Sequence, residues 1–381
     1  MQRTSRSQTV TVVVVVLAVL TAVNLGVSAT WWTRAAAGSP TTSSAAAPPT
    51  SATTAIPSTI PSAIPSAIPS AISTAIATAE PPADGIPAAE APGKTAVPAT
   101  EDLATTWTPP AGMPTTGRLL RVAIPATRSH FTARDALLWL PPAALTADPP
   151  HLPVVVLMSG QSRGAGPEDL QTGGHIEATM DALATLHRGL APIVVVPDQL
   201  GPESANPMCV DGPLGNSATY LEDDVPAWIT SHLTVQSGAA AWTVGGFSQG
   251  GTCAIQIGAG DPERFGNIID VSGEDGPSLG SVQKTIAEGF SGNAAAYRRA
   301  QPAAILAAHG PYRDTDAFFA AGGDDHAYGQ VTPVQAQRAR AAGMHVTTWI
   351  LPGGRHSWST AGPAIAAGLA WLAPRLGVAP S

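Results

Sequence analysis

The sequence predicts an α/β protein with a mostly parallel central sheet and helices on both of its faces. Short apolar runs alternate with helix-like segments from about Thr115 to the C-terminus, which is the pattern of repeated strand–helix–strand units. The composition also changes there, because the preceding residues are dominated by Ala, Pro, Ser, Thr and Val. The globular part therefore has roughly 260 residues, enough for one large domain with a substantial core.

The individual elements follow from the apolar runs and their lengths. Continuous apolar runs at 154–158 and 193–196 are typical of strands buried on both faces. Acidic residues near the start of segment 221–232 favour a helix there, because a helix N-terminus stabilises negative charge. The same criteria predict strands at 118–124, 136–140, 241–245, 267–271, 316–320 and 345–351, and helices at 177–188, 249–259, 333–342 and 361–372.

The N-terminal residues, 1–34, have the pattern of a signal-anchor or a signal peptide. Two arginines precede an apolar span at 10–29, so the arginines should stay inside and the rest of the chain should cross the membrane. Small residues at 27–29 suit cleavage by a signal peptidase. The length of the span and two tryptophans at 31–32 instead favour an uncleaved single-pass anchor. Both alternatives place the globular domain outside the cytoplasm.

The segment 35–114 is predicted to be a disordered linker between this span and the domain at 115–381. An Ile-Pro-Ser-Ala/Thr repeat places proline at every fourth position of 56–71, which excludes helices and sheet ladders. Such a backbone is extended and solvated. The alternative of a repeat solenoid is not favoured, because each unit is too short and too poor in large apolar residues to build a core.

Charge and cysteine content exclude several classes of partner. The formal net charge is −8 and no run of Lys and Arg is present, which argues against nucleic acid. The two cysteines, Cys209 and Cys253, show none of the short spacings of a zinc site or a redox pair. They are either two buried thiols or, in an oxidising compartment, a disulfide.

The segment Gly246-Phe247-Ser248-Gln249-Gly250 is a G-x-S-x-G motif between the predicted strand 241–245 and the predicted helix 249–259. In this context the serine occupies a strained turn that exposes its hydroxyl, and the glycines let strand and helix pack closely around it. The motif therefore predicts Ser248 as a nucleophile. The alternative is a glycine-rich turn without chemistry.

An acid and a histidine are expected downstream of this serine, in that order. The strand at 316–320 leads into a turn that carries two carboxylates, of which we prefer Asp325, with Asp324 as the alternative acid. His356 is the histidine that follows the acid, a strand and a glycine-rich loop. In acyl-transfer chemistry, Ser248 attacks the carbonyl carbon, His356 carries the proton, and the aspartate orients the imidazole.

The oxyanion hole is expected to use two backbone N–H groups. One is that of Gln249, at the start of the helix. The second should come from the loop after the strand 154–158, and we choose Gln161. This chemistry requires no metal and no organic cofactor.

The order Ser248, Asp325, His356, each after a strand, resembles the α/β-hydrolase fold. More narrowly, four stretches match one esterase group: 139–142, 157–161, 246–251 and the Gly-Gly-x-His-Ser-Trp ending at Trp358. In these stretches the domain resembles the group that includes the S-formylglutathione hydrolases and the bacterial mycolyltransferases. The resemblance implies hydrolysis of carboxylic esters or transfer of an acyl group between alcohols. The mycolyltransferases generally use a glutamate as the acid, which this chain lacks at that place.

These features are compatible with three functions. The first is an exported or membrane-anchored serine esterase that acts on an ester-bearing small molecule or lipid. The second is an acyltransferase that passes the acyl group to a sugar or lipid alcohol, which differs from the first in pocket shape and water access. The third is a non-catalytic cell-wall or binding protein on a hydrolase scaffold. In an exported protein, a bond between Cys209 and Cys253 would brace the helix that follows Ser248.

Overall fold

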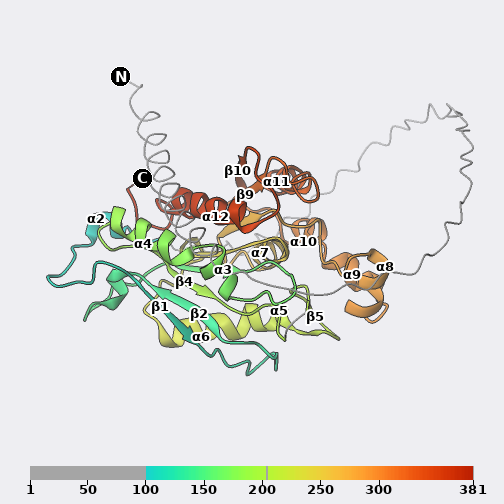
Figure 1. Cartoon of the computed structure of the whole chain (residues 1–381), viewed down its shortest axis with the longest axis horizontal. Helices are drawn as coiled ribbons and strands as arrows, with labels where there is room; N and C mark the ends of the chain where they lie inside the picture. Colours follow the sequence, from blue (N-terminus) through green and yellow to red (C-terminus); the bar gives the residue numbers. More distant parts are fainter. Residues whose placement is uncertain (1–99, 203–204, 381) are drawn as a thin grey trace, which may run out of the picture. The chain divides into compact units, whose positions relative to one another are not determined.

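The computed structural model describes residues 100–202 and 205–380 (Figure 1). The predicted span at 10–29 and most of the predicted linker at 35–114 lie outside the described residues. Among the residues that are described, no helix has the length and apolar character needed to cross a membrane.

The domain is built on an eight-stranded sheet with the strand order β1-β2-β4-β3-β7-β8-β9-β10. The pairs β1–β2 and β2–β4 are antiparallel, and every other neighbouring pair is parallel. The predicted mostly parallel sheet is thus confirmed. The strands are β1 (Arg118–Val122), β2 (Ala136–Leu140), β3 (Val154–Met158), β4 (Ile193–Val196), β7 (Trp242–Phe247), β8 (Asn267–Val271), β9 (Asp316–Gly322) and β10 (His345–Leu351).

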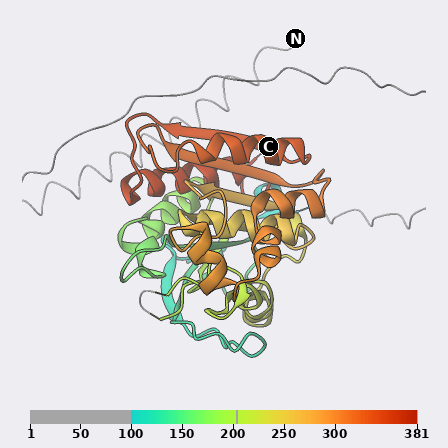
Figure 2. The ribbon, with the colours of Figure 1, turned by 90° about the vertical axis from the view of Figure 1, so that its right-hand side faces the viewer.

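Two groups of helices cover the sheet. Helices α4 (Ile176–Leu186) and α12 (Trp358–Leu372) pack together, and a second group consists of α7 (Gln249–Gly260), α10 (Pro302–His309) and α11 (Val331–Ala341). Figure 2 shows the green α4 on one side of the sheet and the orange helices on the other. Strands β3, β4, β7 and β8 are buried along their whole length, because side chains on both of their faces meet helices.

The folded domain begins before the predicted boundary at Thr115. A short helix, α2 (Leu103–Thr106), buries Leu103 in the core. The backbone N–H of Ala104 donates to the carbonyl of Gly377 at 2.8 Å. Because this hydrogen bond joins residues more than 270 positions apart, local composition did not predict that the folded domain begins before Thr115.

The predicted helix 221–232 is divided in two. Its first part is a π-helical turn, η2 (Tyr220–Asp224), and its second is α6 (Val225–His232). The Asp224 carboxylate accepts hydrogen bonds from the backbone N–H groups of Arg128 and Ser129, at 2.9 and 3.0 Å. This acidic residue therefore anchors a distant loop in addition to lying near a helix N-terminus.

The sequence did not predict the small elements between the main ones. Three of them, α8, η4 and α9, lie together with α10 in the segment between β8 and β9 (Figure 1). The small elements are α3 (Glu168–Thr172), α5 (Ser217–Thr219), α8 (Val282–Lys284), α9 (Ala294–Arg299), η1 (Pro142–Leu145), η3 (Ala239–Ala241), η4 (Thr285–Gly289) and a hairpin of β5 (Asp211–Gly212) and β6 (Gly215–Asn216).

Candidate active site

Ser248 stands in the tight turn between β7 and α7. Its φ of +57° and ψ of −120° are unusual for a residue with a side chain, and such strain persists only where the surroundings hold it. The turn is held by a hydrogen bond from the backbone N–H of Ser248 to the carbonyl of Val271 on β8, at 2.8 Å. The Ser248 side chain therefore lies at the carboxyl end of the parallel strands, where ligands bind in open α/β sheets.

The two glycines of the motif are required by close backbone approaches. A Cβ atom built on Gly246 would lie 2.5 Å from the carbonyl carbon and oxygen of Gly250. One built on Gly250 would lie 2.5 Å from the carbonyl oxygens of Met158 and Ser159. Any side chain at either position would push the helix away from β3 and from the serine.

A chain of hydrogen bonds joins Ser248, His356 and Asp325. The Nε2 atom of His356 lies 2.8 Å from the Ser248 hydroxyl oxygen, and its Nδ1 lies 2.9 Å from Oδ2 of Asp325. Asp325 follows β9 and His356 follows β10, so neighbouring parallel strands deliver both side chains to the same edge of the sheet. The structure thus brings together the three residues predicted as nucleophile, base and acid.

The Asp325 carboxylate is buried and remains ionised. Burial by itself would raise the pKa of Asp325, but the hydrogen bonds from the Tyr328 backbone N–H, at 3.0 Å, and from His356 outweigh it and lower the pKa below its usual value. The alternative acid, Asp324, is exposed, and its backbone N–H is bonded to the Gly354 carbonyl. The structure therefore places Asp325, and not Asp324, against the imidazole.

Aromatic rings surround the His356 imidazole. The ring of Tyr328 lies 4.2 Å away and that of Phe247 lies 4.7 Å away, centroid to centroid. Trp358 packs in turn on Phe247, at 5.0 Å. These contacts restrict the rotation of the imidazole and keep its two nitrogens aimed at Ser248 and Asp325.

The residues predicted for the oxyanion hole lie beside the serine. Gln249 is the first residue of α7, so its backbone N–H has no acceptor within the helix. The loop after β3 approaches from the other side, because a Cβ atom built on Gly160 would lie 3.2 Å from the Cβ of Ser248. Gln161 follows in this loop and lines the same cavity as Ser248.

The cavity beside Ser248 has a volume of about 650 Å³ and is lined by both polar and apolar side chains. Glu274 is a lining residue that the sequence analysis missed, and burial raises the pKa of its carboxyl to about 7. Its place shortly after β8, at the same sheet edge as the other site residues, was the available signal. The lining residues are Gln161, Ala205, Asn206, Leu214, Ser248, Glu274, Ser278, Leu279, Gly280, Lys284, Glu288, Tyr328 and His356.

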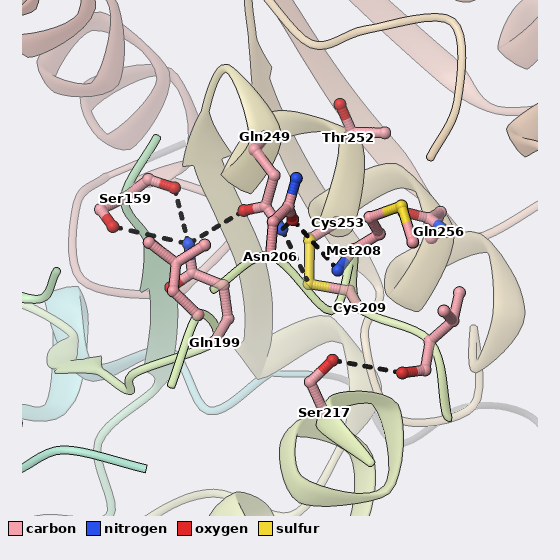
Figure 3. The surroundings of a disulfide bond; sticks show 12 residues. Ser159, Gln199, Asn206, Met208, Cys209, Ser217, Gln249, Thr252, Cys253 and Gln256 are labelled. Atoms are coloured by element: carbon pink, nitrogen blue, oxygen red, sulfur yellow. Dashed lines mark hydrogen bonds between the residues drawn. A yellow bond between two sulfur atoms is a disulfide. The ribbon is translucent and has the colours of Figure 1, made fainter. Parts of the chain in front are cut away.

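Cys209 and Cys253 are joined by a disulfide, in agreement with the expectation for an oxidising compartment (Figure 3). Cys253 lies on α7 and Cys209 lies on the loop that also carries the cavity residues Ala205 and Asn206. The bond therefore attaches one wall of the cavity to the helix behind Ser248. Within 100–202 and 205–380, no group of three or more His, Cys, Asp or Glu side chains is placed to hold a metal ion.

Comparisons with known proteins agree with this geometry. The family described as "Putative esterase" matches residues 133–371. An uncharacterized protein of Corynebacterium glutamicum is 35% identical over 272 residues, which cover 69% of this chain and 63% of that protein. The chain thus spans less than two thirds of the length of this relative.

Solved structures of esterases share the fold. An S-formylglutathione hydrolase from Agrobacterium tumefaciens is similar with a TM-score of 0.55 and 19% identity, over 68% of this chain and 95% of that chain. A ferulic acid esterase is similar with a TM-score of 0.56 and 17% identity, over 68% and 98%. The predicted α/β-hydrolase fold is thereby confirmed for the described domain.

Proposed function

Since this chain belongs to the esterase family and has the α/β-hydrolase fold, we propose that it is a serine hydrolase that cleaves carboxylic esters through an acyl-enzyme formed on Ser248. The observation that carries this proposal is the hydrogen-bonded chain from Ser248 through His356 to Asp325, open to a cavity of about 650 Å³. The family match also weighs against a non-catalytic binding protein.

The proposed reaction has two halves. His356 Nε2 accepts the Ser248 proton as the oxygen attacks the ester carbonyl, and the same nitrogen then protonates the departing alcohol. Water, activated by His356, next attacks the acyl-enzyme, and the acid leaves as Ser248 regains its proton. Asp325 holds Nδ1–H and stabilises the imidazolium in both halves. The backbone N–H groups of Gln249 and Gln161 donate to the oxyanion of each tetrahedral intermediate.

The test combines turnover and covalent labelling of the full chain in mild detergent. The chain should hydrolyse p-nitrophenyl esters, and a fluorophosphonate probe should attach to Ser248, as located by mass spectrometry. Ser248→Ala should abolish both signals, whereas Ser231→Ala, an exposed serine on α6, should change neither. Turnover or labelling that survives in Ser248→Ala would refute the assignment.

Acyl transfer to a sugar or lipid alcohol is the competing outcome of the same experiment. It uses the same acyl-enzyme and differs only in the acceptor that reaches it. Labelling of Ser248 without ester hydrolysis, followed by turnover when an alcohol is added, would favour the transferase.

We propose that the domain works outside the cytoplasmic membrane, attached by the predicted span 10–29. Support comes from the N-terminal pattern and from the Cys209–Cys253 disulfide, because disulfides persist in oxidising compartments. Cell fractionation and intact-mass analysis should find an uncleaved chain in the membrane fraction. A shortened chain in the medium would contradict the anchor, and a cytosolic chain with free thiols would contradict export.

A further inference from the structure

Gln199 bridges the two segments that flank Ser248. It follows β4 and is fully buried. Its Nε2 donates to the carbonyl oxygen of Ser159, at 2.7 Å, and to Oε1 of Gln249, at 3.1 Å (Figure 3). One side-chain amide therefore connects the loop after β3 to the first residue of α7.

These two segments carry the proposed oxyanion donors. The carbonyl of Ser159 and the N–H of Gly160 belong to one planar peptide group, so the hydrogen bond from Gln199 fixes the orientation of that plane. Only the φ and ψ angles of Gly160 then separate the fixed plane from the N–H of Gln161. Because glycine has no Cβ to restrict these angles, a restraint on the preceding peptide has a direct effect on where the Gln161 N–H points.

The Gln249 side chain is held from its other end as well. Its Nε2 donates to Oδ1 of Asn206 at 3.2 Å and lies 3.8 Å from the Cys209 sulfur. Asn206 in turn donates from Nδ2 to the carbonyl of Ser278, at 3.1 Å. A continuous row of amides thus runs from the β3 loop, across the start of α7, to the segment that lines the cavity.

The bridge carries an energetic cost. Among the described residues, Oε1 of the buried Gln199 has no hydrogen-bond partner, and an unsatisfied buried acceptor destabilises the folded state. An apolar side chain of similar size would avoid this cost, but it would leave the Ser159 carbonyl and Gln249 Oε1 without this donor. The amide at this position therefore serves the bridge between the two segments.

We propose that Gln199 is a positioning residue that sets the separation and direction of the two backbone N–H groups of the oxyanion hole. It does not touch the substrate and acts through Ser159 and Gln249. This inference rests on the proposed acyl-enzyme mechanism and adds to it a residue from outside the Ser–His–Asp chain.

Gln199→Leu in the full chain tests the proposal, with Gln256→Leu as a matched control. Gln256 is also a buried glutamine whose Oε1 has no partner among the residues that the structure describes. Within that part of the chain it donates one hydrogen bond, to the carbonyl of Ala300 at 3.1 Å, and it lies farther along α7. Gln199→Leu should lower kcat by at least about tenfold with little change in KM, because a displaced oxyanion donor acts on the transition state. Gln256→Leu should keep kcat within about twofold. Equal kcat values in the two variants, or a loss confined to KM, would overturn the proposal.

Hydrogen–deuterium exchange supplies a readout that does not depend on ester hydrolysis. Peptides that cover residues 157–165 should exchange faster in Gln199→Leu than in Gln256→Leu, because only the first substitution releases the Ser159 carbonyl. Unchanged exchange in this segment would refute the bridging role even if the enzyme is active. If Gln199→Leu exchanges faster but the unmodified chain cleaves no ester, the result would support the bridge and refute the proposed function instead.

Discussion

Asp324 and Asp325 are neighbours in the sequence, but their side chains have different surroundings. Asp325 is buried and contacts His356 Nδ1, whereas Asp324 is exposed. Both residues belong to a turn in which the Asp325 N–H donates to the Gly322 carbonyl, and the hydrogen bond from the Asp324 N–H to the Gly354 carbonyl holds that turn in place. The hydrogen bond from Tyr328 N–H then completes the environment of Asp325.

We predict that Asp325→Asn lowers kcat by about 10³ to 10⁴, because an amide stabilises the wrong imidazole tautomer and not the imidazolium. Asp324→Asn is the matched control and should stay within about twofold of the unmodified chain. Steady-state hydrolysis of a p-nitrophenyl ester measures both. A larger loss in Asp324→Asn than in Asp325→Asn would reverse the assignment of the acid.

A second buried carboxyl, Asp270 on β8, links stability to pH. Burial raises the pKa of Asp270 to about 7, and the hydrogen bond from the Gly273 N–H only partly opposes this. The unfolded chain releases the same proton near pH 3.9. Between about pH 4 and pH 7 the folded state therefore binds more protons, so this residue makes stability fall as the pH rises.

Asp270→Asn should remove this contribution, because the amide oxygen still accepts from Gly273 and never ionises. The variant should match the unmodified chain at pH 4 and exceed its free energy of unfolding by on the order of 2–4 kcal/mol at pH 8. Urea unfolding at a series of pH values measures the difference. A difference that is constant across this range would show that Asp270 does not titrate as described.

At the scale of elements, the strand–turn–helix unit of β7 and α7 depends on how closely its backbone segments approach. Gly250 lies at the first turn of α7 against β3, whereas Gly260 lies at the last position of the same helix. In the described part of the chain, a Cβ atom on Gly260 would come within 4 Å of Ile305 alone, at 3.9 Å. Close packing therefore requires a glycine at position 250, whereas position 260 has room for a side chain.

Gly250→Ala should destabilise the domain by about 1–3 kcal/mol and lower kcat, because the new methyl group meets two backbone carbonyls that cannot easily move. Gly260→Ala should be neutral or stabilise by about 0.4–1 kcal/mol through the unfolded chain. Thermal unfolding and ester hydrolysis of the pair check this. Similar melting temperatures for both variants would contradict the prediction, because they would show that α7 can move to accommodate the methyl group without loss of stability.

At the scale of the whole molecule, the Cys209–Cys253 disulfide closes the chain segment 209–253 into a loop. The two cysteines are 44 residues apart in sequence. In the chain-entropy model, a disulfide that closes a loop of this length stabilises the folded state by about 4 kcal/mol, because it lowers the entropy of the unfolded chain. The closed loop contains the β5–β6 hairpin, α6 and the nucleophile turn.

Replacement of both cysteines by serine should therefore lower the free energy of unfolding by about 2–4 kcal/mol. A reducing agent should produce a similar loss in the unmodified chain and none in the variant. Urea unfolding with and without the reductant measures this. Insensitivity of the unmodified chain to reduction would contradict a stabilising bond.

The sequence by itself determined the sheet, its main helices and the residues at the centre of the site. Local signals suffice for these: continuous apolar runs define the buried strands, and G-x-S-x-G between a strand and a helix marks Ser248. The carboxylate pair Asp324–Asp325 and His356 followed because parallel strands end at a common edge, where residues far apart in the chain meet.

Only the tertiary structure decided which carboxylate faces His356, where the domain begins, and which amides support the serine. Burial and hydrogen-bond direction separate Asp325 from Asp324, and neither is encoded in a local pattern. The Ala104 N–H donates to the Gly377 carbonyl near the C-terminus, and Gln199 bridges Ser159 and Gln249, residues 40 and 50 positions away along the chain. Such contacts depend on the three-dimensional approach of distant segments, because a side-chain amide carries no sequence signal for the partner that it will reach.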